Sequence, residues 1–254
     1  MVGPWKVEWV EEIDSTNSQI LRYSDVVDNM SVLAARFQSA GRGQRGNRWI
    51  VQKGVNLTFS IALRPGKDPV PDIKAAGQFP LSELSSLSVL STLRDYGIPS
   101  SVKWPNDIYI GDRKVCGMLI ENKISQDGGL GLCVVGIGLN VNQRSFDPSL
   151  MNPVSMASCP EGAGRVFDLE EVLGVLLGHY SRYLGMLASS PQGLHDEYVS
   201  KMYRLCEWHE YTDCRSGAPF EGKILGCTPQ GLLRVLRRDG EELSFAFKEI
   251  SYII

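Results

Sequence analysis

Residues 38–49 read QSAGRGQRGNRW and lie between two apolar runs, residues 31–37 and 57–63, that we predict to be buried strands. The stretch has no apolar periodicity and is therefore predicted to be a loop. Three glycines in six positions let the backbone approach a ligand closely, three arginines supply positive charge, and Trp49 ends the loop with a flat ring. This composition suits an anion such as a phosphate. An exposed basic turn would look similar, so the loop alone leaves both interpretations open.

The chain on either side of this loop alternates between strand and helix patterns. Leucines recur every three residues from Leu81 to Leu93, and Asp168 with Glu171 predicts a capping box ahead of a second, longer helix. Further strands are predicted at residues 6–13, 115–121 and 130–137, a short helix at 19–23, and short β-like pieces at 220–225, 232–236 and 243–247.

These patterns predict an α+β fold made of two parts. Residues 1–210 are predicted to form a domain that combines helices and strands, and residues 211–254 a small β-barrel.

A second motif, VKWPNDI at residues 102–108, combines a lysine, an indole, a proline and two polar side chains. Lys103 at the edge of a strand could neutralise a developing negative charge, and Asn106 could reach a ligand or a metal-bound water. The alternative is a strand followed by a proline turn, with Asn106 and Asp107 as ordinary turn residues.

Two weaker motifs complete the set. In GIGLNVN, residues 136–142, small residues at a strand end would allow another molecule to pack on the backbone. In DSTN, residues 14–17, the polar side chains could cap a helix, and a helix N-terminus also offers free N–H groups to a ligand. Neither a dinucleotide-binding fingerprint nor a Walker motif occurs in the sequence.

Composition narrows the class of protein. Of the 254 residues, 43% are hydrophobic and the formal net charge is −3, which disfavours nucleic-acid binding as a main function. The six cysteines form no C-x-x-C pair and only three histidines are present, so no zinc motif is expected. The N-terminus lacks the pattern of a signal peptide, and no apolar run is long enough to cross a membrane. A cytoplasmic enzyme with reduced cysteines is expected.

Taken together and in this order, the four motifs resemble those of the biotin–protein ligase family: S-T-N, Q-x-A-G-R-G-x-R-G-x-x-W, K-W-P-N-D and G-I-G-x-N. The resemblance covers residues 13–142 and extends more weakly to the helix after Asp168 and the β-module after Tyr211. It implies a catalytic domain built on a mixed β-sheet flanked by helices, followed by a small SH3-like barrel. It also implies that biotin and ATP, with Mg2+, form biotinyl-5'-AMP, and that biotin then passes to a lysine on the biotin carrier domain of a carboxylase.

The resemblance also implies roles for individual residues. Lys103 and Arg42 would be catalytic, with Lys103 contacting the carboxylate and the phosphate. The residues expected around biotin and its adenylate are Ser15, Thr16, Asn17, Gln38, Gly41, Arg42, Gly43, Gln44, Lys103, Gly117, Gly136 and Gly138. Those expected at ATP are Arg45, Trp49, Asn106 and Asn140, with Trp49 stacking on adenine.

Two departures from the family pattern matter. The family loop often reads G-R-G-R-R-G, but Gln44 stands here in place of the second arginine, and we expect weaker retention of the adenylate. The catalytic pattern also begins within the first 15 residues, so we expect neither the N-terminal DNA-binding domain of some members nor repression through it.

Several alternatives stay open at this stage. A lipoate–protein ligase shares the fold and activates a similar acid, and a non-catalytic protein could sequester biotin or dock carrier domains. The natural acceptor, the function of the β-module and pairing into a homodimer are not fixed by the sequence.

Overall fold

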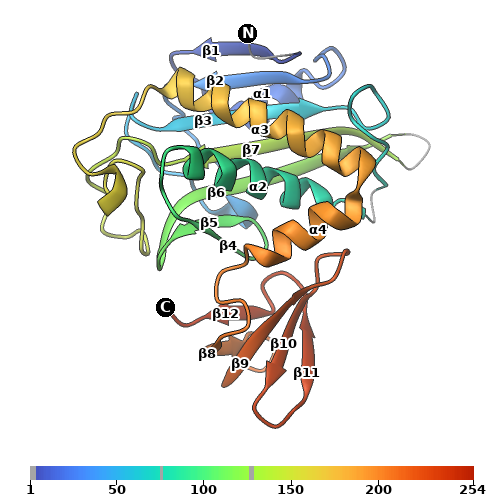
Figure 1. The fold of residues 1–254 in the computed structure, drawn as a ribbon. Helices are drawn as coiled ribbons and strands as arrows, with labels where there is room; N and C mark the ends of the chain where they lie inside the picture. Colours follow the sequence, from blue (N-terminus) through green and yellow to red (C-terminus); the bar gives the residue numbers. More distant parts are fainter. Residues whose placement is uncertain (1–3, 75–76, 126–128) are drawn as a thin grey trace.

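The computed structural model describes residues 4–74, 77–125 and 129–254, and the backbone alone of Arg45. Its larger sheet has the order β1-β2-β3-β7-β6-β5-β4, in which β1 and β2 are parallel and every other neighbouring pair is antiparallel (Figure 1). The strands are β1 (Lys6–Val10), β2 (Ser31–Ala35), β3 (Leu57–Leu63), β4 (Ser101–Lys103), β5 (Asp107–Ile110), β6 (Arg113–Ile124) and β7 (Leu130–Leu139).

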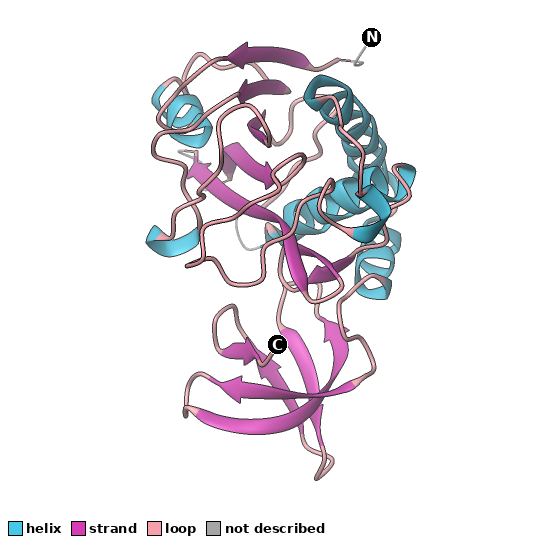
Figure 2. Cartoon of the chain, turned by 90° about the vertical axis from the view of Figure 1, so that its left-hand side faces the viewer, coloured by secondary structure: helices cyan, strands magenta, loops and turns pink. Residues whose placement is uncertain are grey.

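Helices cover both faces of this sheet. The long helices α2 (Phe79–Asp95) and α3 (Leu169–Ser189) lie together on one face, and α4 (Pro191–Ser200) leads from them to the C-terminal strands (Figure 1). The short helix α1 (Thr16–Arg22) packs on β3 and β7 from the opposite side, which Figure 2 shows at right angles to the first view. No helix in the described ranges is long and apolar enough to cross a membrane.

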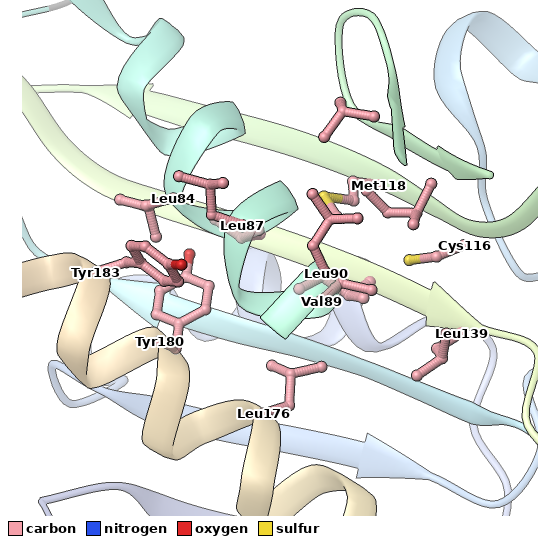
Figure 3. Packing of buried hydrophobic residues seen from close by; sticks show 14 of the residues in the cluster. Leu84, Leu87, Val89, Leu90, Cys116, Met118, Leu139, Leu176, Tyr180 and Tyr183 are labelled. Atoms are coloured by element: carbon pink, nitrogen blue, oxygen red, sulfur yellow. The ribbon is translucent and has the colours of Figure 1, made fainter. Parts of the chain in front are cut away.

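The main core lies between α2, α3 and the sheet, where apolar side chains from all three meet (Figure 3). Because α2 is enclosed by the sheet and by α3, four of its five serines are buried along with its leucines. Three of these four hydroxyl groups have hydrogen-bond partners, and only that of Ser86 has none among the described residues. Ser85, for example, donates to the Leu81 carbonyl at 2.6 Å and lies 3.0 Å from the Tyr180 hydroxyl. Such pairing avoids the cost of burying a polar group without a partner.

A second, five-stranded antiparallel sheet forms the C-terminal module, with the order β11-β10-β9-β8-β12. Trp104 joins it to the larger sheet, because its Nε1 donates to the Gly231 carbonyl at 3.2 Å and its ring contacts Phe247 edge-on. The strands are β8 (Trp208–Asp213), β9 (Ala218–Cys227), β10 (Leu233–Arg237), β11 (Glu242–Phe245) and β12 (Ile250–Tyr252).

Most predicted elements are present, and so are the predicted α+β class and the small β-module. The strand at residues 57–63 is confirmed as β3. Strand β1 ends earlier than predicted, at Val10, because Glu11 and Glu12 are exposed, although Ile13 still pairs with Gln38 in an isolated bridge. The proposed domain division after residue 210 stays a prediction, and β8 runs across it.

The helix starts follow the predicted caps with two corrections. Helix α1 begins at Thr16 rather than near residue 19, because the Ser15 hydroxyl accepts from the Ser18 N–H. Asp168 caps α3 by accepting from the N–H groups of Glu170 and Glu171. The Glu171 carboxylate, however, accepts a hydrogen bond from the Tyr96 hydroxyl at 3.3 Å, so it does not complete the predicted capping box. Helix α4 was not predicted.

Candidate active site

A cleft of about 630 Å³ opens on the side of the larger sheet that carries α1. Its floor is formed by β6 and β7, and its walls by the start of α1, the loop at residues 38–50, the turn after β4 and the C-terminal segment at residues 247–252. Every predicted site residue whose side chain the structure describes lines this cleft, with the exception of Gly41. Gly41 shapes the loop instead, since a Cβ there would lie 2.5 Å from the Trp49 carbonyl oxygen. The side chain of Arg45 lies outside the described structure.

At one end of the cleft, a buried polar network surrounds the start of α1. The Thr16 N–H donates to Gln38 Oε1 at 2.7 Å, and the Thr16 hydroxyl lies 2.6 Å from that of Ser60. The Asn17 amide donates to Glu121 Oε2 at 2.9 Å and to the Leu119 carbonyl at 3.2 Å. These bonds fix the side chains in place before a ligand arrives, so the network is suited to recognising a small molecule with several polar groups.

Two glycines of β7 face the same side of the sheet and make room for protein side chains. A Cβ on Gly136 would lie 2.3 Å from Asn17 Oδ1, and a Cβ on Gly138 would lie 2.3 Å from Trp49 Cε2. The Trp49 indole also lies over Gly117 of β6, 3.0 Å from its Cβ position. The sequence predicted that a ligand would pack on these glycines; in the structure, Asn17 and Trp49 occupy those positions.

The basic loop is held over the cleft by side-chain contacts. Both terminal nitrogens of Arg42 donate to the Glu121 carboxylate, at 2.8 and 3.1 Å, in an ion pair that is partly exposed. Gln44 Nε2 donates to Asn106 Oδ1 at 3.1 Å and to the Met118 carbonyl at 3.2 Å. An arginine at residue 44 would carry a charge there, whereas Gln44 fastens the loop to the floor through neutral hydrogen bonds.

Two lysines border the cleft in different surroundings. The Lys103 ammonium lies 5.2 Å from the ring centre of Tyr109 and 4.9 Å from that of Tyr252, and burial lowers its pKa. Lys114 Nζ forms an ion pair with Asp107 at 2.7 Å and lies 5.9 Å from the Trp49 ring. Lys114 also lies 3.1 Å from the Cβ position of Gly117, directly over the floor of the cleft.

Sequence reasoning missed several of these residues. Lys114 and Glu121 lie in β6, within a strand pattern that gave no sign of a functional side chain. Glu121 could have been suspected only as a carboxylate in an otherwise apolar strand. The C-terminal module also borders the cleft, through Phe247, Lys248, Ile250, Ser251 and Tyr252. No local motif marks that segment.

The fold and the cleft define a class of protein: an α+β domain with a polar pocket and a cationic loop on a mixed sheet, joined to a small β-module. Residues 9–140 match the model of the biotin/lipoate A/B protein ligase family, and the chain belongs to that family.

Curated relatives agree with this family. The bifunctional ligase/repressor BirA of Escherichia coli is 34% identical over 141 residues, which are 55% of this chain and 42% of that protein. The biotin–[acetyl-CoA-carboxylase] ligase of Paracoccus denitrificans is 29% identical over 186 residues, 68% of this chain and 71% of the relative. The matched region is thus less than half of the E. coli protein.

Solved structures extend the likeness to nearly the whole chain. The biotin protein ligase of Aquifex aeolicus, solved in complex with biotin and ATP, superposes with a TM-score of 0.77 at 29% identity and covers 97% of both chains. The predicted fold, including the SH3-like C-terminal module, is confirmed by this likeness.

Proposed function

We propose that this chain is an ATP-dependent biotin–protein ligase, which activates biotin as biotinyl-5'-AMP and transfers it to a lysine on the biotin carrier domain of a carboxylase. The proposal rests on one observation: a buried polar pocket and a set of cationic side chains line the same cleft. The names of the Paracoccus denitrificans and Aquifex aeolicus relatives support the same function.

In the first step, a biotin carboxylate oxygen attacks the α-phosphorus of ATP, and pyrophosphate leaves. Ser15, Thr16, Asn17 and Gln38 are proposed to hold the ring system of biotin, because they form the polar end of the cleft. Trp49, Asn106, Asn140 and Arg45 are proposed to bind the nucleotide. Asn140 is anchored for this role, since its amide donates to the Val154 carbonyl at 3.0 Å.

Two anions must approach each other in this reaction, so the cleft has to neutralise negative charge. Arg42 and Lys103 are proposed to do so at the carboxylate and the α-phosphate, and the position of Lys114 over the floor makes it a second lysine for the same task. Arg42 would exchange its ion pair with Glu121 for the ligand, and because this pair is partly exposed, water can take over some of its contacts.

Mg2+ is expected with ATP, and the cleft has suitable donors. The Asp107 carboxylate and the amide oxygens of Asn106 and Asn140 border it, and hard oxygen donors are what this ion prefers. When bound, the ion neutralises phosphate charge.

In the second step, the amine of the acceptor lysine attacks the acyl carbon of biotinyl-AMP, and AMP leaves. The mixed anhydride must be protected from water between the two steps. The loop at residues 41–49 is placed for this, because Gln44 ties it to Asn106 and to the floor at Met118.

The test is a direct transfer assay. The purified chain is mixed with Mg-ATP and a purified biotin carrier domain, together with either biotin or lipoate, and the carrier is weighed by mass spectrometry. We expect an ATP-dependent biotin adduct and none from lipoate. A lipoate adduct alone would assign the chain to the lipoate branch of its family. Biotin binding without any adduct would indicate a non-catalytic protein.

A further inference from the structure

Away from the cleft, three side chains from distant parts of the sequence meet where the C-terminal module contacts helices α2 and α4. They are Glu83 of α2, His195 of α4 and Cys227 at the end of β9, and the ligand atoms that they offer all lie within 4.8 Å of one another. From this arrangement we propose a site that binds Zn2+ and thereby links the C-terminal module to helices α2 and α4. Figure 1 shows α4 beside the strands of this module.

Burial makes this cluster unusual. Glu83 is 1% exposed, His195 8% and Cys227 6%. A carboxylate in such a place needs a cation or a proton, because an unpaired buried charge is very costly. His195 Nδ1 lies 2.6 Å from Glu83 Oε1, and its Nε2 lies 3.1 Å from the Cys227 carbonyl oxygen. The imidazole thus already links helices α2 and α4 to the module through two hydrogen bonds, one to the Glu83 carboxyl group and one to the Cys227 carbonyl.

The donor set suits zinc by charge and by softness. Thiolate, imidazole and carboxylate are its three common protein ligands, and one of each with Zn2+ gives a site with no net charge. Tetrahedral zinc places neighbouring nitrogen and oxygen ligands roughly 3.4 Å apart. For the ion to replace the proton between His195 Nδ1 and Glu83 Oε1, these two atoms must therefore move apart from 2.6 Å by less than about 1 Å. Burial raises the pKa of the Cys227 thiol to about 12, so the ion displaces a proton from the sulfur as it binds.

The site has an entry path and room for a fourth ligand. An open groove runs beside the cluster and is bordered by His195 and Cys227 together with Gln192, Asp196 and Thr228. Water that enters from this groove can complete four-fold coordination. Three protein ligands with water in the fourth position are the coordination that zinc has in catalytic sites, so this donor set can hold the ion without a fourth side chain.

The test uses the full chain with any affinity tag removed, stripped by a chelator and titrated with Co2+ and with Zn2+. We expect one equivalent of Co2+ to give the visible bands of tetrahedral cobalt and a thiolate-to-cobalt charge-transfer band. Zn2+ should abolish both, and its affinity is measured against a chromogenic chelator. Saturation with Zn2+ should also raise the melting temperature, since the ion binds the folded state.

Matched variants identify the ligands. Cys227→Ser should lose the charge-transfer band and weaken Zn2+ binding at least tenfold. Changes to residues that only support a metal ligand already lower metal affinity by about 10–100-fold, so loss of a ligand should cost at least the lower of these values. Cys206→Ser, at an exposed cysteine outside the cluster, should change neither. Glu83→Gln keeps the shape and should weaken binding while leaving the thiolate band. Zinc-edge X-ray absorption on the wild type adds a readout that needs no variant, and one sulfur ligand is expected.

Three results would overturn the proposal: no stoichiometric binding of either ion, a zinc spectrum without sulfur, or a thiolate band that survives Cys227→Ser. Each would leave Glu83 and His195 as a hydrogen-bonded clasp that shares a proton. None of them bears on the ligase proposal, because the cluster borders a different groove from the catalytic cleft.

Discussion

Replacing Gly138 by alanine tests the architecture of the cleft floor. The added Cβ would lie 2.3 Å from Trp49 Cε2 and 2.4 Å from its Nε1, whereas ordinary van der Waals contact begins at 3.4 Å. The indole must therefore retreat by about 1.1 Å, the difference between 3.4 and 2.3 Å. Gly138 lies in β7 between β3 and β6, so the strand cannot move instead.

The expected cost follows from overpacking, which amounts to about 1–3 kcal/mol at well-packed positions. Because Trp49 is on a loop, we expect this free energy to appear in nucleotide binding rather than in folding. At about 1.4 kcal/mol per factor of ten, kcat/KM for ATP should fall roughly 5- to 150-fold. The assay is biotin-dependent exchange of pyrophosphate into ATP, measured at saturating biotin, with thermal unfolding recorded alongside.

Two other glycines serve as controls. Gly136→Ala would place its Cβ 2.3 Å from Asn17 Oδ1, so it should raise the KM for biotin more than that for ATP. Gly178→Ala, in α3 with nothing within 4 Å of its Cβ position, should leave both unchanged. A Gly138→Ala variant that keeps kcat/KM for ATP within twofold of the wild type, or that changes only the KM for biotin, would refute the role given to Trp49 at the nucleotide.

Three further predictions concern single side chains. Lys103→Ala should lose about 2.7–4 kcal/mol of transition-state stabilisation in single-turnover adenylation, which is the cost of removing one oxyanion donor from an enzyme. Near-normal adenylation by this variant, together with a loss of that size in Lys114→Ala, would assign the role to Lys114. Gln44→Arg should slow release of biotinyl-AMP, because it adds a positive charge to the loop proposed to cover the adenylate, and an unchanged release rate in a filter-binding assay refutes that explanation. Asp168→Ala should lower the free energy of unfolding by about 1 kcal/mol in a urea titration, because the N-cap of α3 is lost; no change in the midpoint would show that the cap contributes nothing.

The sequence predicted the parts of the fold that depend on local pattern. The apolar run at residues 57–63 became β3, and Asp168 caps the helix that it was predicted to begin. Helix α4 was missed because its ten residues include Gly193 and show little apolar periodicity. It is fixed instead by tertiary contacts, such as the Tyr198 hydroxyl donating to the Pro105 carbonyl at 2.7 Å.

The site divides in the same way. The motif residues meet in one cleft because each ends or follows an element of the same sheet. Lys114, Glu121 and Tyr252 could not be found in this way, since their place in the cleft depends on strand order and on the docking of the C-terminal module. The cluster of Glu83, His195 and Cys227 was even less accessible to sequence analysis. Glu83 and His195 are 112 residues apart, and the three residues lie in three different elements, so only the folded chain brings them together.

The measurement that tests the central claim most directly is the mass of a biotin carrier domain after incubation with this chain, Mg-ATP and biotin. A carrier heavier by one biotinyl group, only when ATP is present and not when lipoate replaces biotin, is the predicted result. An unmodified carrier, with biotin bound but no pyrophosphate released, would contradict the claim that this cleft is the active site of a biotin–protein ligase.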